Sequence, residues 1–136
     1  MIYLDTCLVI YLAEHDDHWS QGVRSAIEQR TGGTLAISPL VQAECLVGPL
    51  KRGDSVMEDA YEHLFREFRV LNIESTTFLD AARLRARFGL KMVDAIHLAC
   101  AQHHGCDALW TNDSRLAGAA GGMAVDLGLG QFQNPI

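Results

Sequence analysis

The sequence lacks the features of membrane proteins and of secreted, disulfide-rich proteins. Its 136 residues contain no apolar run long enough to cross a bilayer, and the opening residues form no basic, signal-like segment. The four cysteines (Cys7, Cys45, Cys100 and Cys106) form no C-x-x-C pair, and their spacing fits no zinc site. Since all four lie in or beside apolar runs, we expect reduced thiols in a cytoplasmic protein with no membrane partner.

Positive charge is also scarce. The chain has 11 lysines and arginines against 17 aspartates and glutamates, for a net charge of -6. This balance excludes a protein that coats nucleic acid non-specifically, because such binding requires a positive surface. Nucleic acid stays open as a substrate, because an acidic metal site contributes negative charge of its own.

The chain has no linker, internal repeat or low-complexity tract, so we expect residues 1–136 to form a single domain. Hydrophobic residues make up 49% of it and charged residues 21%, which excludes disorder. Short apolar runs are predicted to be strands at residues 2–4, 35–37, 70–73, 108–111 and 123–127. Helical patterns separate these runs, which predicts an α/β fold with a parallel sheet and helices on both faces.

Capping residues indicate where several helices begin. A helix is expected over residues 7–13, and Asp16 or Asp17 is expected to cap the next one. The Ser-Pro pair at residues 38–39 predicts another helix start, and a loop at residues 48–53 is expected to end that helix.

Two further helices are expected in the second half of the chain. Ser55 and Glu58 match a capping box, which predicts that Ser55 caps one of them. Ser75 is expected to cap the other, with an inward face made of Phe78, Ala81, Ala82 and Leu84.

Residues 92–101, Met-Val-Asp-Ala-Ile-His-Leu-Ala-Cys-Ala, are almost all small or apolar, with Asp94 among them. They show no polar face, which predicts a helix packed on several sides. A carboxylate there costs free energy unless it is paired, hydrogen-bonded or bound to a metal. His97 shares the face of Asp94 and is open to three interpretations: a general base, a ligand or a hydrogen-bonded core histidine, of which the last is favoured.

Four acidic residues are predicted to converge. Asp5 ends the first strand, Asp113 follows the fourth, Asp94 stands near the start of the central helix, and Glu44 lies in the helix after the second strand. Binding crevices in open parallel sheets lie beyond the carboxyl ends of the strands. Each residue alone has an ordinary alternative: Asp5 and Asp94 as helix caps, Asp113 as a turn residue and Glu44 as a solvent-side residue.

Together these carboxylates would repel one another, so we expect a cation among them. Mg²⁺ or Mn²⁺ suits a carboxylate cage that keeps some waters, and such a site cleaves phosphodiesters readily. Thr6, Thr111 and Asn112 are polar neighbours that can orient the ligands, with cap or turn roles as the alternative.

Several basic residues are candidates for steering a phosphate backbone toward this site. Arg83 and Arg87 lie one helical turn apart, and Lys51 and Arg52 lie in the expected loop. A solvated surface is the alternative for all four.

Four segments of the sequence resemble the PIN domain family, and more narrowly the VapC ribonuclease toxins of toxin–antitoxin pairs. The segments are Tyr-Leu-Asp-Thr at 3–6, Val-Gln-Ala-Glu-Cys-Leu-Val-Gly-Pro-Leu-Lys-Arg-Gly at 41–53, Gly-Leu-Lys-Met-Val-Asp-Ala-Ile-His-Leu-Ala at 89–99, and Leu-Trp-Thr-Asn-Asp at 109–113. The resemblance covers nearly the whole chain in the right order. In place of the Phe that often follows the last acidic residue of the family, this chain has Leu116, which can fill the same apolar role.

The resemblance implies a three-layer α/β/α fold with a parallel sheet of about five strands. It implies Mg²⁺- or Mn²⁺-dependent RNA cleavage, a homodimer, and inhibition by a small antitoxin whose C-terminal segment occupies the acidic groove. Carried over residue by residue, Asp5 and Asp94 match the usual direct metal ligands. Glu44 and Asp113 match the residues that complete the site, directly or through water.

Two other functional classes remain as alternatives. The domain can be a PIN-like module that binds RNA or protein through a site that has lost catalysis. Aspartyl-phosphate chemistry also uses an Asp after the first strand, but one such class needs a second Asp where Cys7 stands. A dinucleotide enzyme is disfavoured, since no G-x-G-x-x-G follows the first strand.

Overall fold

Five parallel strands form the single sheet in the computed structural model, which describes residues 1–14, 18–30 and 32–129. The strands are β1 (Ile2–Leu4), β2 (Leu35–Ile37), β3 (Arg69–Val70), β4 (Ala108–Thr111) and β5 (Ala124–Asp126). Their order is β3-β2-β1-β4-β5, with every pairing parallel. The expected α/β fold with five parallel strands is therefore confirmed.

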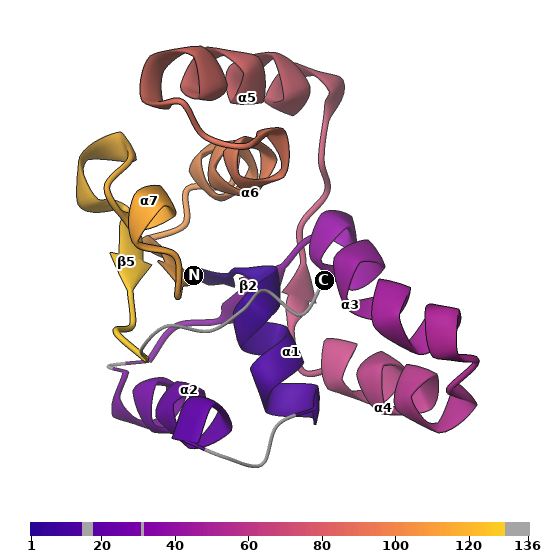
Figure 1. The fold of residues 1–136 in the computed structure, drawn as a ribbon. Coiled ribbons are helices and arrows are strands. Elements are labelled where there is room, and N and C mark those ends of the chain that lie inside the picture. The colour runs from indigo at the N-terminus through magenta and orange to yellow at the C-terminus, as the bar shows by residue number, and fades with distance from the viewer. Residues whose placement is uncertain (15–17, 31, 130–136) are drawn as a thin grey trace.

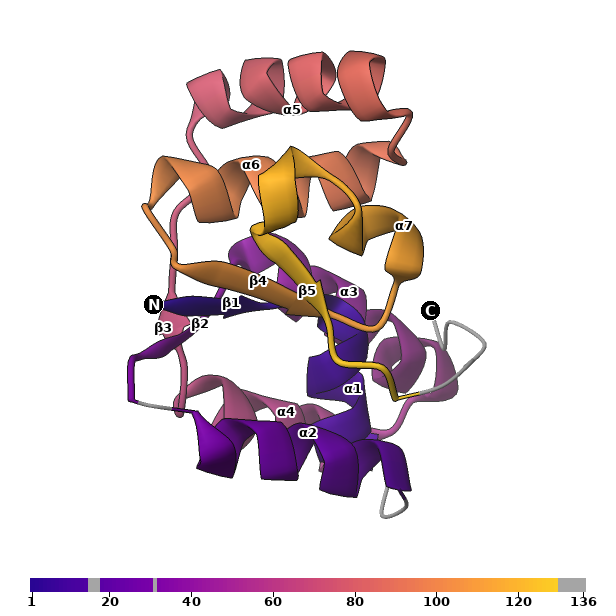
Figure 2. The same cartoon turned by 90° about the vertical axis from the view of Figure 1, so that its left-hand side faces the viewer.

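Helices cover both faces of this sheet. They are α1 (Thr6–Glu14), α2 (His18–Gln29), α3 (Pro39–Arg52), α4 (Ser55–Phe65), α5 (Ser75–Phe88), α6 (Met92–His103) and α7 (Ser114–Ala117), with a short 3₁₀ turn, η1 (Ala120–Gly122). Helices α5 and α6 lie above the sheet in the view of Figure 2, whereas α1, α2 and α4 lie below it. The result is the three-layer α/β/α arrangement, and Figure 1 shows α5 lying outside α6.

The core is built around β1 and α6. Tyr3 and Leu4 in the central strand are fully buried, and every residue from Ala95 to Ala101 on α6 is buried. This confirms a central helix that packs on several sides. Asp94 lies one residue before that run, at the edge where the core meets solvent.

Helix α3 is longer than expected, and the predicted loop at 48–53 is wrong. The helix continues to Arg52 and ends at Gly53, whose positive φ of 65° is easy only for glycine. Pro49 within the helix removes one backbone hydrogen bond. It is buried, as is Cys45 one turn earlier, so packing against the domain offsets that loss.

The predicted caps of α4 and α5 also require correction. Asp54, and not Ser55, caps α4, because its Oδ1 accepts a 3.0 Å hydrogen bond from the backbone N–H of Met57. Ser75 is the first residue of α5, and its cap position is taken by Glu74 without a side-chain bond. Capping by Asp16 or Asp17 lies outside the described residues.

The predicted inward face of α5 is correct for Ala81 and for the half-buried Leu84, but wrong for Phe78 and Ala82. Thr77 and Ala81 are buried, whereas Phe78 is 51% exposed and Ala82 is exposed. The apolar residues are too evenly spread around this helix for periodicity to choose the face. Strand β3 is likewise shorter than expected: it stops at Val70, after which the Leu71 N–H donates to the carbonyl of Ile37.

All four cysteines are free thiols, with Cys45, Cys100 and Cys106 buried and Cys7 half-buried. Within the part of the chain that the structure describes, none of the helices is long and apolar enough to cross a membrane.

Candidate functional site

Asp5 lies at the carboxyl end of the central strand, directly before α1. Its carboxylate is almost fully buried: Oδ1 accepts a 2.8 Å bond from the Thr6 N–H, and Oδ2 accepts a 2.7 Å bond from the Thr111 hydroxyl. Oδ2 also accepts a longer, 3.9 Å bond from the Cys7 thiol, so both oxygens have protein donors. The first turn of α1 and the last residue of β4 together fix the direction of this carboxylate.

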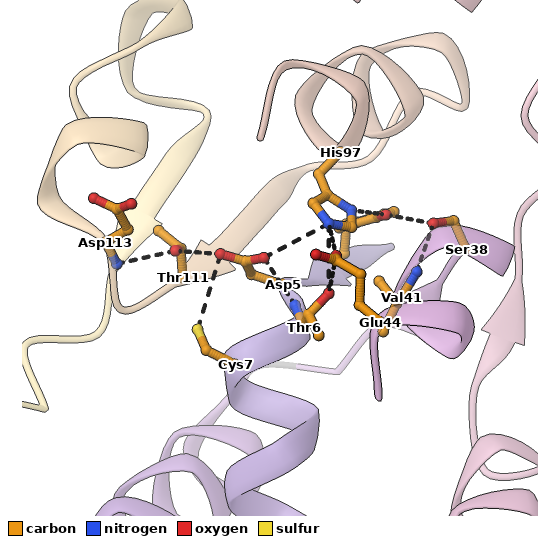
Figure 3. Close-up of polar contacts among 10 residues, drawn as sticks. Asp5, Thr6, Cys7, Ser38, Val41, Glu44, His97, Thr111 and Asp113 are labelled. Carbon is orange, nitrogen blue, oxygen red and sulfur yellow. Dashed lines mark hydrogen bonds and ion pairs between the residues drawn. The ribbon is translucent and has the colours of Figure 1, made fainter. Parts of the chain in front are cut away.

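Asp113 is joined to Asp5 through Thr111. The Asp113 N–H donates a 3.0 Å bond to the Thr111 hydroxyl oxygen, and Figure 3 shows Thr111 between the two acidic residues. Asp113 also caps α7, since its Oδ1 accepts a 2.9 Å bond from the Arg115 N–H. The turn role considered for Asp113 is thus real, and it uses only one carboxylate oxygen. Leu116, three residues after Asp113, is fully buried and fills the apolar position.

Glu44 points toward the buried interior and not into solvent. Its Oε1 accepts a 2.6 Å bond from the Thr6 hydroxyl and lies 2.7 Å from Nε2 of His97. Burial raises the pKa of Glu44, but the bond to His97, the charge of His97 and the bond from Thr6 outweigh it, so the pKa is lowered. Glu44 is therefore held as a carboxylate beside Asp5.

His97 is a buried, hydrogen-bonded histidine, which confirms the favoured interpretation of this residue. It is 1% exposed and bonds Glu44 on one side and Tyr3 on the other. Burial lowers the pKa of His97, but the bond to Glu44 and the charges of Asp5, Glu44 and Asp94 outweigh that effect and raise it. The charges of three acidic residues thus favour the protonated form of the His97 ring.

Asp94 is the third residue of α6 and does not cap it, because Lys91 occupies the cap position. Its pKa is raised to about 6, first by burial and then by the negative charges of Asp5 and Asp113. Lys91 and His97 act in the opposite direction and do not cancel the shift. The Asp94 carboxylate on α6 is therefore close enough to be repelled by Asp5, directly after β1, and by Asp113, after β4.

The polar neighbours divide into two groups. Thr6 and Thr111 bond the acidic residues directly, as described above. Asn112 bonds other parts of the fold: its side-chain amide donates to the Tyr11 hydroxyl at 3.4 Å and accepts from the Leu129 N–H at 3.1 Å.

Two of the four predicted steering residues are engaged elsewhere. Arg52 pairs with Glu14 at 3.1 Å, and Arg83 pairs with Asp80 at 2.7 Å. Lys51 is exposed, and the Arg87 guanidinium lies 5.1 Å from the centre of the Phe88 ring.

Sequence reasoning missed Tyr3 and Ser38. Both are fully buried, and the Tyr3 hydroxyl lies 2.7 Å from the Ser38 hydroxyl and 2.6 Å from Nδ1 of His97. The available signal was a tyrosine in an otherwise apolar central strand, because a buried tyrosine hydroxyl needs a partner.

The donor set fits a hard divalent cation by its chemistry. The candidate ligands are carboxylate oxygens. A positive ion relieves the repulsion from Asp5 and Asp113, which adds to burial in raising the pKa of Asp94. Over residues 1–14, 18–30 and 32–129, no three Asp, Glu, His or Cys side chains are already grouped tightly enough to hold an ion.

Comparison with known proteins places this geometry in a family. The PIN domain family matches residues 2–122. Ribonuclease VapC46 of Mycobacterium tuberculosis is 34% identical over 128 residues, which cover 91% of this chain and 95% of that protein. A toxin–antitoxin complex from Klebsiella pneumoniae contains a chain 26% identical, with a TM-score of 0.77 over 93% of this chain and 98% of that one.

A second solved structure, VapBC2 from Rickettsia felis bound to a DNA fragment from their promoter, has the same fold. Its matched chain is 18% identical, with a TM-score of 0.73 over 93% of this chain and 98% of that one. The family match spans the strands and helices that carry all four acidic residues, and the chain therefore belongs to the PIN domain family, as a relative of the VapC ribonucleases.

Proposed function

We propose that the protein is a Mg²⁺- or Mn²⁺-dependent endoribonuclease and the toxin of a VapBC-like type II toxin–antitoxin pair. The observation that carries the proposal is the placing of Asp94 beside Asp5 and Asp113 in a partly buried site, where burial first and then the negative charges of these two residues raise the pKa of Asp94 to about 6. A cluster of this kind destabilises the metal-free protein, and a bound divalent cation would offset that destabilisation. Its position beyond the carboxyl ends of β1 and β4 is where parallel sheets bind ligands.

Asp5 and Asp94 are proposed as the direct ligands, with Glu44 and Asp113 contributing directly or through water. A bound Mg²⁺ or Mn²⁺ supplies a water of lowered pKa and positive charge for the phosphate oxygens. The residues of the chain fix that arrangement: Thr6 and Thr111 hold the two oxygens of Asp5 in place.

Three partners follow from this proposal. RNA is the substrate, and Lys51 and Arg87 are the steering residues without a carboxylate partner among the ion pairs of the described chain. A small antitoxin is proposed to place its C-terminal segment in the acidic groove, which is supported by structural neighbours that are toxin–antitoxin complexes. A homodimer in the cytoplasm, each subunit a single domain, completes the proposal.

Metal removal is the first test. Purified protein is expected to cleave RNA in millimolar Mn²⁺ or Mg²⁺, to lose cleavage in EDTA, and to regain it when Mn²⁺ is restored, as judged from new RNA ends on a gel. Because the ion binds only the native state, Mn²⁺ is also expected to raise the melting temperature.

The competing function is a PIN-like binding module without catalysis. RNA binding with neither cleavage nor a Mn²⁺-dependent rise in melting temperature would favour that module. Cleavage that persists unchanged in EDTA would instead reject the metal-dependent reaction.

A further inference from the structure

We propose that His97 is a positioning residue: with Tyr3 and Ser38 it forms a buried hydrogen-bond relay that holds Glu44 with a single oxygen free for a divalent cation. The inference rests on the proposed metal site and concerns residues to which that site gives no other role. Figure 3 shows the relay running from Ser38 at the start of α3 to Glu44 within the same helix.

The relay crosses three elements of the fold. Ser38 precedes α3, Tyr3 lies in β1, and His97 lies in α6. The Tyr3 hydroxyl lies 2.7 Å from the Ser38 hydroxyl and 2.6 Å from Nδ1 of His97. Nε2 of His97 lies 2.7 Å from Oε1 of Glu44. Ser38, Tyr3 and His97 are each no more than 1% exposed. Water therefore does not compete for these bonds, and their geometry is set by the packing of the sheet against α6.

The direction of the protons follows from Glu44. A carboxylate only accepts hydrogen bonds, so Nε2 of His97 carries a proton toward Glu44 whether the ring is neutral or charged. In the neutral ring Nδ1 then accepts from the Tyr3 hydroxyl, and the Tyr3 oxygen accepts from the Ser38 hydroxyl. The Ser38 oxygen itself accepts from the Val41 N–H at 3.4 Å, so every proton in the relay has an acceptor.

This arrangement leaves the two oxygens of Glu44 unequal. His97 and Thr6 both bond Oε1, which uses both of its lone pairs. Within the described part of the chain, Oε2 accepts no hydrogen bond from protein, so that oxygen is the one available to a cation or to a water bound to it. Histidine, tyrosine and serine are costly core residues compared with apolar ones. Apolar residues could fill the same space, but they could not hold Glu44 by hydrogen bonds.

Mn²⁺ affinity, measured by titration calorimetry on the whole protein, separates this role from a purely structural one. Loss of an outer partner of a metal ligand weakens binding by about 10- to 100-fold. His97→Leu is expected to reach that range. His97→Gln is expected to lose less, because its amide N–H can replace Nε2 as the donor to Glu44.

Tyr3→Phe keeps the packing and removes only the hydroxyl, so it carries the test if the His97 variants fail to fold. It is expected to weaken Mn²⁺ binding by about 3- to 10-fold, below the loss at His97 because Tyr3 acts one bond further away. Tyr61→Phe is the matched control: Tyr61 is also fully buried and donates its hydroxyl to a carboxylate, Glu14, outside the acidic site. Both tyrosine variants are expected to melt at lower temperature, but only Tyr3→Phe should bind Mn²⁺ less tightly.

The tautomer of His97 provides a readout that does not depend on the metal. Above the pH at which the ring loses its extra proton, ¹⁵N spectra of the wild type are expected to show a single tautomer protonated at Nε2. A ring protonated at Nδ1 overturns the relay, as does Mn²⁺ binding that Tyr3→Phe and Tyr61→Phe leave equally tight. A wild type that binds no Mn²⁺ overturns the proposed metal site itself, and the relay's role with it.

Discussion

Replacing Asp94 by Asn is expected to abolish RNA cleavage while leaving the fold as stable as before or more stable. Asparagine keeps the shape of the side chain but removes the charge that a divalent cation requires. The loss is expected to exceed about a hundredfold, the upper end of what even an outer partner of a ligand causes. Cleavage measured in Mn²⁺ tests the loss of activity, and unfolding measured in EDTA on the same preparations tests the stability.

The stability half follows from the raised pKa of Asp94, which lies at about 6 in the native protein. A raised pKa means that the native state prefers the protonated form. This preference stabilises the fold fully below about pH 4, the pKa of an unfolded Asp, and is lost as the pH rises through about 6. The metal-free wild type should therefore lose stability relative to Asp94→Asn as the pH rises from about 4 to about 6. The loss is expected to be only about 1 kcal/mol, because solvent screens this partly exposed group.

Asp59→Asn is the matched control for Asp94→Asn. Asp59 is exposed on α4, and its replacement removes one negative charge without touching the acidic site. It should cleave RNA as the wild type does. Wild-type cleavage by Asp94→Asn would show that this carboxylate takes no part in the reaction, and a large loss of stability would show that it is not repelled by its neighbours.

Asp5→Asn is expected to abolish cleavage as well, but with the opposite effect on stability. Both oxygens of Asp5 accept bonds from protein donors, and the amide nitrogen of Asn would replace one of these acceptors. Hydrogen bonds to charged groups contribute about 1.5–3 kcal/mol each, so the metal-free variant should unfold at lower denaturant concentration. Relief of repulsion with Asp94 returns part of that free energy, which leaves a net loss of about 1 kcal/mol.

Chemical denaturation in EDTA distinguishes the two variants directly. Asp94→Asn is expected to be the more stable of the pair, although both variants are inactive. Equal stability of the two would mean that the Thr6 and Thr111 bonds contribute little to holding Asp5.

The sequence supports the fold and the convergence of the acids because both follow from the order of the elements. Apolar runs separated by helical patterns lead to a parallel sheet, and an acid placed just after such a strand must lie at the carboxyl edge. Asp5 and Asp113 were placed by this rule, and the central strands β1 and β4 confirm it. The continuous burial of α6 followed from the same composition.

Features that depend on packing between helices and strands cannot be predicted from the order of the elements. The continuation of α3 through Pro49 depends on what the proline contacts, and the orientation of α5 depends on the surface of α6. The helix propensities of the residues in each segment predict neither feature. The contact between Tyr3, Ser38 and His97 joins residues far apart in the sequence. The pairing of β1 with β2 brings Tyr3 beside Ser38, and the packing of α6 on the sheet adds His97.

Anomalous diffraction from a crystal grown or soaked in Mn²⁺ tests the central claim most directly. The account predicts a manganese peak bonded to Asp5 and Asp94, with Glu44 and Asp113 bonded to it or to its waters. Full manganese exposure that leaves these side chains apart, with no anomalous density among them, would contradict it.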